Sequence, residues 1–403
     1  MMKKYAAALL TVCLLLVSAC GSAGEEPRQE ETTLPQQTTG TSAPESSSQI
    51  PESSEELETG EADGGQEETQ PSAPEDMVQR DPETKDDISQ ILLEAMEDLR
   101  EQAEFDIAGM TWEFGAENDL KNIYYAILSD HGELKYTYDM EVSISGDTAV
   151  CTFSYMPYMT GAYDDGVPEG TGTIGSLYDA RALAQEMTDG TERMPVAITN
   201  PSLLIDDIQR ALAQAGYGWI VYNLSEDGTE LTAEAPVGKS MDECVSAIRE
   251  SFRLCDEIVS ERVTGSMTEE EKIKALYDYI AGNVAYDFRY YSDRENMPYE
   301  STVAIGALRD HLAICGGYAQ AFEMLLDSIG VENYTVSGIY RNEYHMWNYV
   351  VLDGVGYYCD PTSDRGGMSN HFMLTVEQLT ADGDYSWDHE FLQKISGAAD
   401  RPE

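Results

Sequence analysis

The feature that most limits the fold of this chain is the tract from residue 21 to residue 85, which contains no Phe, Trp or Tyr. It consists mainly of Glu, Ser, Thr, Gln, Pro and Gly, as in PESSEELETGEADGGQEETQPSAPED. A segment of this composition buries too little apolar area to offset its conformational entropy, and it is expected to be disordered. As a flexible tether it would reach about 45 Å. A globular fold is therefore expected only beyond this tract.

The first residues have the pattern of an export signal. The basic pair Lys3-Lys4 precedes an apolar run from Ala6 to Val17, which is too short for a typical membrane span. The stretch LVSAC resembles the lipobox of bacterial lipoproteins, in which the cysteine after the cleavage site receives a lipid. The alternative is a short membrane anchor with an unmodified cysteine. We predict an extracytoplasmic protein, lipid-anchored to a bacterial membrane, with a signal peptide at 1–19, lipid on Cys20 and a disordered linker at 20–85.

The charge of the chain excludes one class of partner. The sequence has 75 acidic and 24 basic residues, which gives a formal net charge of −51. A polyanion of this size is repelled by phosphate backbones, so no nucleic-acid partner is expected. Solubility is the simplest explanation of the acidity.

The cysteines predict at least one free thiol. Of seven cysteines, Cys13 would leave with the signal peptide and Cys20 would carry lipid, so five remain. An odd number in an exported protein leaves one thiol unpaired. Cys244 and Cys255 are 11 residues apart on one predicted helix, which places them on one face. We expect buried core thiols there rather than a metal or redox pair.

Helices and hairpins alternate in the first part of the expected globular region. Apolar residues at helical spacing predict a helix near 88–99, followed by a hairpin around Gly146-Asp147. A further hairpin is expected around Asp227-Gly228, and then a helix from Met241 to Val259. Because no catalytic constellation is visible between residues 86 and 262, this segment is predicted to be an α+β accessory domain.

Cys315 precedes a predicted helix in AICGGYAQAFEMLLDSIG. Apolar residues form its buried stripe and Gly330 ends it. A cysteine at a helix N-terminus meets the positive end of the dipole and free backbone N–H groups. Both favour a thiolate, and the N–H groups could hold an oxyanion. A buried core cysteine is the alternative, and position alone does not decide between the two.

A predicted hairpin brings two more polar residues into register. HMWNYVVL and VGYYCDPT are joined by Asp353-Gly354, a type I′ turn signal that fixes the pairing. In this register His345 and Asp360 are diagonal neighbours on one face of the sheet, about 7–8 Å apart at the backbone. This separation permits the hydrogen bond that a general base and its orienting carboxylate require. Cys359 should face the opposite side and pack in the core.

These blocks resemble a known family. CGGYAQAFEMLLDSIGV, HMWNYVVLDG and YYCDPTSD are similar to three signature blocks of the transglutaminase-like superfamily, a relative of papain-like cysteine peptidases. HFMLTVEQL resembles the family's closing segment, and a predicted helix with a capping box at Thr268 and Glu271 its opening one. The resemblance implies that Cys315 is the nucleophile, His345 the general base, and Asp360 the residue that orients His345. Related enzymes also have an oxyanion donor upstream of the cysteine, for which the candidates are Tyr286, Tyr290 and Tyr291.

The fold expected from these features is α+β. A papain-like or transglutaminase-like domain is predicted at 266–403, with its nucleophile at the N-terminus of a helix packed on an antiparallel sheet. No cofactor or metal is expected. Alternating acids near the C-terminus imitate a calcium loop, but Trp387 replaces its turn glycine and Gln393 its terminal glutamate.

The function implied is that of a cysteine hydrolase or acyltransferase. Such an enzyme would act on amide or peptide bonds of a protein or peptide substrate, for example cell-wall peptide, through a thioester intermediate. Peptidase or deamidase activity is favoured over protein cross-linking. One alternative is a catalytically silent surface module that binds cell-wall peptide or another surface protein. Another is that residues 86–262 carry the main function.

The lipobox can be tested by mutation. Cys20→Ala removes the only residue that can accept the lipid in LVSAC, so the protein should leave the membrane fraction and appear in the soluble fraction. Cell fractionation and immunoblotting measure this, with Cys13→Ala as the matched control that should remain membrane-bound. Sedimentation of Cys20→Ala with membranes, as for the unmodified sequence, would exclude lipid anchoring at this position.

Overall fold

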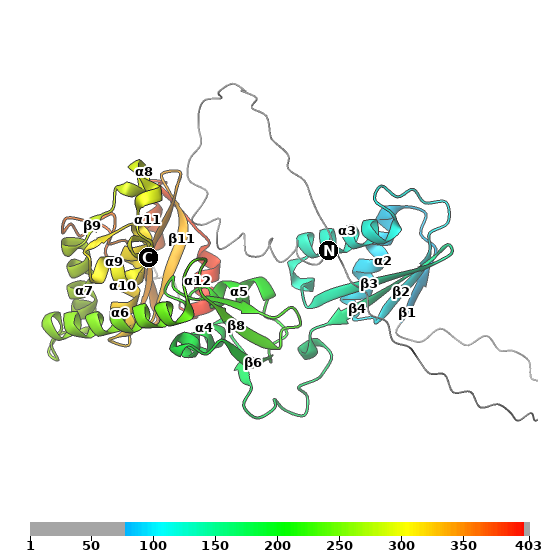
Figure 1. Ribbon diagram of the computed structural model, residues 1–403, viewed down its shortest axis with the longest axis horizontal. Coiled ribbons are helices and arrows are strands. Elements are labelled where there is room, and N and C mark those ends of the chain that lie inside the picture. Colours follow the sequence, from blue (N-terminus) through cyan, green and yellow to red (C-terminus); the bar gives the residue numbers. More distant parts are fainter. Residues whose placement is uncertain (1–76, 399–403) are drawn as a thin grey trace, which may run out of the picture. The chain divides into compact units, whose positions relative to one another are not determined.

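The computed structural model describes residues 77–398 as a mixture of helices and β-sheets (Figure 1). The predicted signal peptide, Cys20 and most of the predicted linker lie outside these residues. Among the described helices, none combines the length and apolar character needed to cross a membrane.

The first sheet and its two helices have a core of their own. The strand order is β1-β2-β4-β3, and β3 and β4 form the hairpin predicted around Gly146-Asp147. A capping box at Thr84 and Asp87 starts the first helix, and Ile88, Leu92 and Phe105 are among the buried residues of this core. The elements are β1 Met77–Arg80, α2 Lys85–Glu97, β2 Gln102–Asp106, α3 Ala116–Asp130, β3 Thr137–Ser145 and β4 Thr148–Tyr155.

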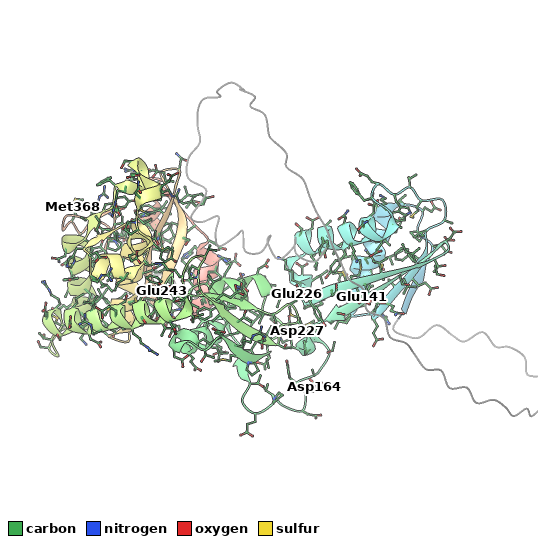
Figure 2. All side chains as sticks on the ribbon, in the orientation of Figure 1. Glu141, Asp164, Glu226, Asp227, Glu243 and Met368 are labelled. Carbon is green, nitrogen blue, oxygen red and sulfur yellow. The ribbon has the colours of Figure 1, made fainter. Side chains whose placement is uncertain are left out.

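A second four-stranded sheet follows, in the order β5-β6-β8-β7. The hairpin predicted around Asp227-Gly228 joins β7 to β8, and Figure 2 labels Asp227 at its tip. The elements are β5 Gly172–Ile174, α4 Leu177–Glu186, β6 Arg193–Ile198, α5 Ile205–Leu212, β7 Val221–Leu224 and β8 Glu230–Glu234. Their buried residues belong to the same hydrophobic cluster as those of the C-terminal part. The segment predicted as one accessory domain therefore contains two sheets with different cores.

The C-terminal part is built around one buried helix, α10 Cys315–Asp327. This helix contacts three other helices and one face of a sheet with the order β13-β12-β11-β14 (Figure 1). The helices are α6 Met241–Arg262, α7 Glu269–Asn283, α8 Arg289–Ser292, α9 Ala304–Leu308, α11 Val376–Thr380 and α12 His389–Ser396. The strands are β9 Ala285–Tyr286, β10 Leu312–Ala313, β11 Asn333–Tyr340, β12 Glu343–Leu352, β13 Val355–Cys359 and β14 Tyr385–Ser386.

The predicted hairpin register is confirmed. Leu352 pairs with Val355, and the ladder runs on to the pair Asn348 and Cys359. Asp353 and Gly354 have φ values of 54° and 75°, as both central residues of a type I′ turn require. The strand ends at Cys359, so Asp360 is the first residue beyond it.

The cysteines also follow the sequence prediction. Cys244, Cys255 and Cys359 are fully buried in the core. The five cysteines in the described part are all free, and among them Cys315 alone is partly exposed.

A buried ion pair ties the second sheet unit to helix α10. The Arg181 guanidinium on α4 donates to Glu323 Oε1 at 3.1 Å, and both side chains are buried. Tyr217 Oη donates to Asp327 Oδ2 at 2.8 Å, one turn further along α10. Burial raises the pKa of Glu323 and of Asp327, and the charge of Arg181 opposes the rise. Arg181 thus compensates the buried acidic side of the helix that begins at Cys315.

Loss of this cation should destabilise the fold. Arg181→Met leaves two buried carboxyl groups without a positive partner, and we expect the free energy of unfolding to fall by about 3–5 kcal/mol. Urea denaturation followed by circular dichroism measures it. The matched control is Arg193→Met. Arg193 on β6 forms an exposed ion pair with Glu230 on β8, and its loss should lower the free energy of unfolding by less than about 1 kcal/mol. Equal losses in both variants would contradict a special role for the buried pair.

Candidate active site

The start of helix α10 places Cys315 under a closely packed loop. Cys315 is the first helical residue, and Ile314 N before it donates to Ser301 O at 2.8 Å. A Cβ on Gly316 would lie 2.7 Å from Thr302 O, and one on Gly317 would lie 2.9 Å from Val303 O. Only glycine allows the loop backbone to come this close. The sulfur therefore sits at the positive end of the helix dipole, as the sequence predicted.

His345 and Asp360 form a direct pair. His345 Nε2 lies 2.8 Å from Asp360 Oδ2, which leaves the other ring nitrogen free to exchange a proton. Burial of His345 favours the neutral ring, but the Asp360 carboxylate outweighs it, and a hydrogen bond and charge from Cys315 add to the effect. Together they raise the pKa of His345 to about 10. The structure thus brings Cys315, His345 and Asp360 together, with the imidazolium as the favoured form at neutral pH.

The Asp360 carboxylate has more donors than the sequence suggested. Oδ1 accepts from the backbone N–H groups of Thr362 and Ser363 at 3.0 and 3.1 Å. Oδ2 accepts from Ser363 Oγ at 2.6 Å and from Tyr385 Oη at 2.7 Å, besides His345. Burial opposes ionisation of Asp360, but His345 and these hydroxyl groups hold its pKa well below the usual range. Asp360 is therefore a buried carboxylate.

The sequence motifs did not predict the contacts of Ser363 and Tyr385 with Asp360. Ser363 lies within the block YYCDPTSD, so its closeness to Asp360 was a usable signal. Tyr385 comes from β14, which pairs with Ile339 and Tyr340 at the edge of the sheet. A strand of two residues carries no periodic pattern, so no sequence signal pointed to it.

Aromatic rings enclose the imidazole. The ring centroid of His345 lies 5.4 Å from that of Tyr340 and 5.7 Å from that of Trp347, which stacks on it at 24°. Tyr385 stands 6.3 Å away and contacts both of these rings. The rings restrict water and hold the imidazole plane in one orientation.

Among the three candidate oxyanion donors, the structure favours Tyr286. It lies on β9 and pairs with Ala313, two residues before Cys315. Burial raises the pKa of Tyr286, and the charge of Cys315 is the next cause. Tyr286 therefore keeps its proton and can donate it in a hydrogen bond. Tyr291 is largely exposed, and its hydroxyl donates to Glu343 Oε2 at 2.9 Å and also shares a hydrogen bond with the Tyr286 hydroxyl.

The alternating acids near the C-terminus have other partners. Asp384 pairs with Arg341 at 2.8 Å, and Asp388 caps helix α12 through the N–H of Phe391. Among the described residues, no group of three or more His, Cys, Asp or Glu side chains is placed to hold a metal ion.

Comparison with known proteins identifies the segment that contains this site. The model of the transglutaminase-like superfamily matches residues 256–360. The chain contains a transglutaminase-like domain. The family predicted from the sequence blocks is thereby confirmed, and the matched segment contains Cys315, His345 and Asp360. The transglutaminase-like match begins inside helix α6, ten residues before the boundary predicted at 266.

The relatives of this transglutaminase-like domain include a named peptidase. Kyphoscoliosis peptidase from Homo sapiens is 28% identical over 123 residues, and that from Mus musculus is 26% identical. The match covers 28% of this chain and 18% of each relative, so the chain spans under a fifth of their length. A crystal structure described as a TGase is 16% identical with a TM-score of 0.26, over 48% of this chain and 59% of that one.

The electrostatics of the pair predict a measurable pH dependence. Folding raises the pKa of His345 from 6.5 to about 10, so protonation of His345 stabilises the fold, and this contribution is lost as the pH rises through about 10. Folding lowers the pKa of Asp360 from 3.8, so the pair is fully stabilising only between about pH 4 and pH 6.5, and the contribution of Asp360 is lost at more acidic pH. Asp360→Asn removes the carboxylate that raises the pKa of His345 most, so this pKa should fall by about 1–3. Nuclear magnetic resonance titration of the histidine rings measures it.

A matched control uses an acid that lies directly before strand β14 of the same sheet. Asp384→Asn breaks an exposed pair with Arg341 and should leave the titration of His345 unchanged. His345→Gln assigns the signal. A midpoint near 6.5 in the unmodified protein, or the same midpoint in Asp360→Asn, would contradict the interaction.

Proposed function

We propose that this protein is an extracytoplasmic, lipid-anchored cysteine hydrolase that attacks amide or peptide bonds of a peptide substrate. The observation that carries the proposal is the His345–Asp360 hydrogen bond of 2.8 Å beside Cys315 at the N-terminus of α10. The family match and the named peptidase among the relatives support a cysteine enzyme. Cys315, His345 and Asp360 are the proposed catalytic residues.

In the first step the Cys315 thiolate attacks the carbonyl carbon of the amide. The carbonyl electrons move to oxygen, and the N–H groups at the start of α10 and the hydroxyl of Tyr286 stabilise this oxyanion. As the oxyanion collapses, the C–N bond breaks and the His345 imidazolium gives its proton to the leaving amine. The products are a thioester on Cys315, a free amine and a neutral His345.

In the second step water attacks the thioester. Neutral His345 takes a proton from the water, and the second tetrahedral oxyanion collapses with loss of the Cys315 thiolate. A carboxylic acid leaves, and the thiolate and imidazolium are restored. Asp360 stays ionised throughout and keeps the imidazole in one tautomer and orientation.

Hydrolysis is favoured over transfer to an amine because the named relative is a peptidase. Protein cross-linking would follow the same first step, with a substrate amine in place of water. The competing function is a catalytically silent module that binds cell-wall peptide or another surface protein. The buried, ionised Asp360 argues against it, because a binding module has no need of a charged pair held beside a thiol.

The proposal predicts one dominant reactive thiol. Burial raises the pKa of Cys151 and of Cys359 to about 12, so both should be inert at neutral pH, whereas Cys315 is partly exposed. An amide-directed electrophilic probe should add once to the protein, on Cys315, as read by intact-mass and peptide mass spectrometry. His345→Ala should slow this labelling and peptide turnover by about a hundredfold or more, because the general base is lost.

Matched variants decide the outcome. Cys315→Ala should abolish labelling and turnover, and Cys151→Ala, at a buried thiol of the first sheet, should leave both unchanged. Labelling that persists in Cys315→Ala would reject Cys315 as the nucleophile. Equal labelling of the unmodified protein and His345→Ala, with no turnover of any peptide, would favour the binding module.

A further inference from the structure

An arginine near the proposed site has no carboxylate partner among residues 77–398. The guanidinium Cζ of Arg365 lies 5.7 Å from the ring centroid of Tyr286, and the Arg365 side chain is exposed. Within the part of the chain that the structure describes, Arg365 forms no ion pair; its polar contact is a hydrogen bond from Nη1 to Thr362 O at 3.1 Å. In a chain with 75 acidic residues, this positive charge is left open to solvent.

The loop that carries Arg365 is anchored on both sides. Asp364 before it is fully buried and accepts hydrogen bonds from Tyr277 Oη and from the backbone and ring of His371. Gly366 N after it donates to Ala281 O on α7 at 2.8 Å. The backbone at Arg365 is therefore held in place before any ligand arrives, and the bond to Thr362 O restrains the guanidinium, which reduces the entropy lost on binding.

Arg365 lies over Tyr286, and Tyr286 is a neighbour of the proposed nucleophile Cys315. Tyr286, over which it lies, neighbours Cys315 through the β9–β10 pair, and the Cys315 charge acts on Tyr286. The charge of Arg365 also acts on Tyr318, one turn into α10, where it opposes the rise in pKa that burial causes. A group bound by Arg365 would thus lie near Tyr286, the proposed oxyanion donor.

The chemistry of the arginine selects the ligand. A guanidinium presents parallel N–H donors that match a carboxylate, and such charge-assisted bonds are stronger than neutral ones. The net charge of −51 does not prevent this, because at physiological ionic strength charges more than about 8 Å apart are largely screened. Phe288, which contacts the Tyr286 ring and is 61% exposed, offers apolar surface for the rest of a peptide.

We propose that Arg365 binds a carboxylate of the substrate next to the attacked amide, so that the site prefers anionic peptides. The proposal rests on the proposed function and names its substrate class. The carboxylate can come from an Asp or Glu side chain or from a peptide C-terminus. Arg365 is then a specificity-determining residue. Met368, which Figure 2 labels, lies three residues further along the same loop and is half exposed.

The test compares matched peptides. One set carries a single Glu, Gln or Lys at successive positions around the attacked amide, and a second set has a free or amidated C-terminus. Turnover is measured with the unmodified protein, Arg365→Gln and Arg365→Glu, and equilibrium binding with the same changes in a Cys315→Ala background. Arg262→Gln is the matched control, because Arg262 likewise lies over a tyrosine, Tyr279, with 5.2 Å from Cζ to the ring centroid.

The unmodified protein should favour the Glu peptide over the Gln peptide by about fivefold in kcat/KM, the upper range for a partly exposed ion pair. Arg365→Gln should reduce this ratio to about one, Arg365→Glu should reverse it in favour of the Lys peptide, and Arg262→Gln should keep it. The C-terminal set shows which carboxylate is used. A ratio unchanged in Arg365→Gln, or a ratio of one in the unmodified protein for every set, overturns the proposal.

The binding measurement separates this proposal from the proposed function. If no peptide is turned over, hydrolysis fails, and the preference of Cys315→Ala for anionic over neutral peptides still decides the role of Arg365. A preference that disappears with Arg365→Gln supports the carboxylate site. Absence of any preference in binding refutes it.

Discussion

The charge on Asp360 is the constraint on which the rest of the site depends. A carboxylate 1% exposed cannot be hydrated, so the protein must supply donors for both oxygens. The donors come from three segments: His345 on β12, the turn at Thr362 and Ser363, and Tyr385 on β14. The sheet, the turn and the edge strand must all be in place before the ion is tolerated. Asp360 can therefore be ionised only when this end of the sheet is correctly assembled.

Two parts of the site were predictable from residues close together in the chain: the hairpin register and the helix that begins at Cys315. The Asp353-Gly354 turn fixed the register that brings His345 and Asp360 to one face, because a two-residue hairpin leaves no freedom of pairing. Helical spacing after Cys315 predicted its place at a helix N-terminus. Both inferences needed only residues close together in the chain.

The features that the sequence did not reveal depend on contacts between distant residues. Tyr385 reaches Asp360 across 25 residues from a two-residue strand. Arg181 meets Glu323 across 142 residues, and nothing around either residue indicates its partner. For the same reason one predicted accessory domain proved to contain two sheets, since the grouping of apolar residues into cores depends on tertiary packing.

The contacts of Arg181 and Tyr385 determine which residues a stable fragment of this protein must contain. The family match ends at residue 360, yet Tyr385 lies beyond it and Arg181 lies well before its start. A fragment cut to the matched borders would keep the three proposed catalytic side chains but lose a donor to the buried carboxylate and the counter-charge of the central helix. The matched segment contains the Cys315, His345 and Asp360 cluster, while residues before and after it stabilise the buried charges of Glu323 and Asp360. The smallest unit that could fold with an intact site is therefore larger than the family match at residues 256–360.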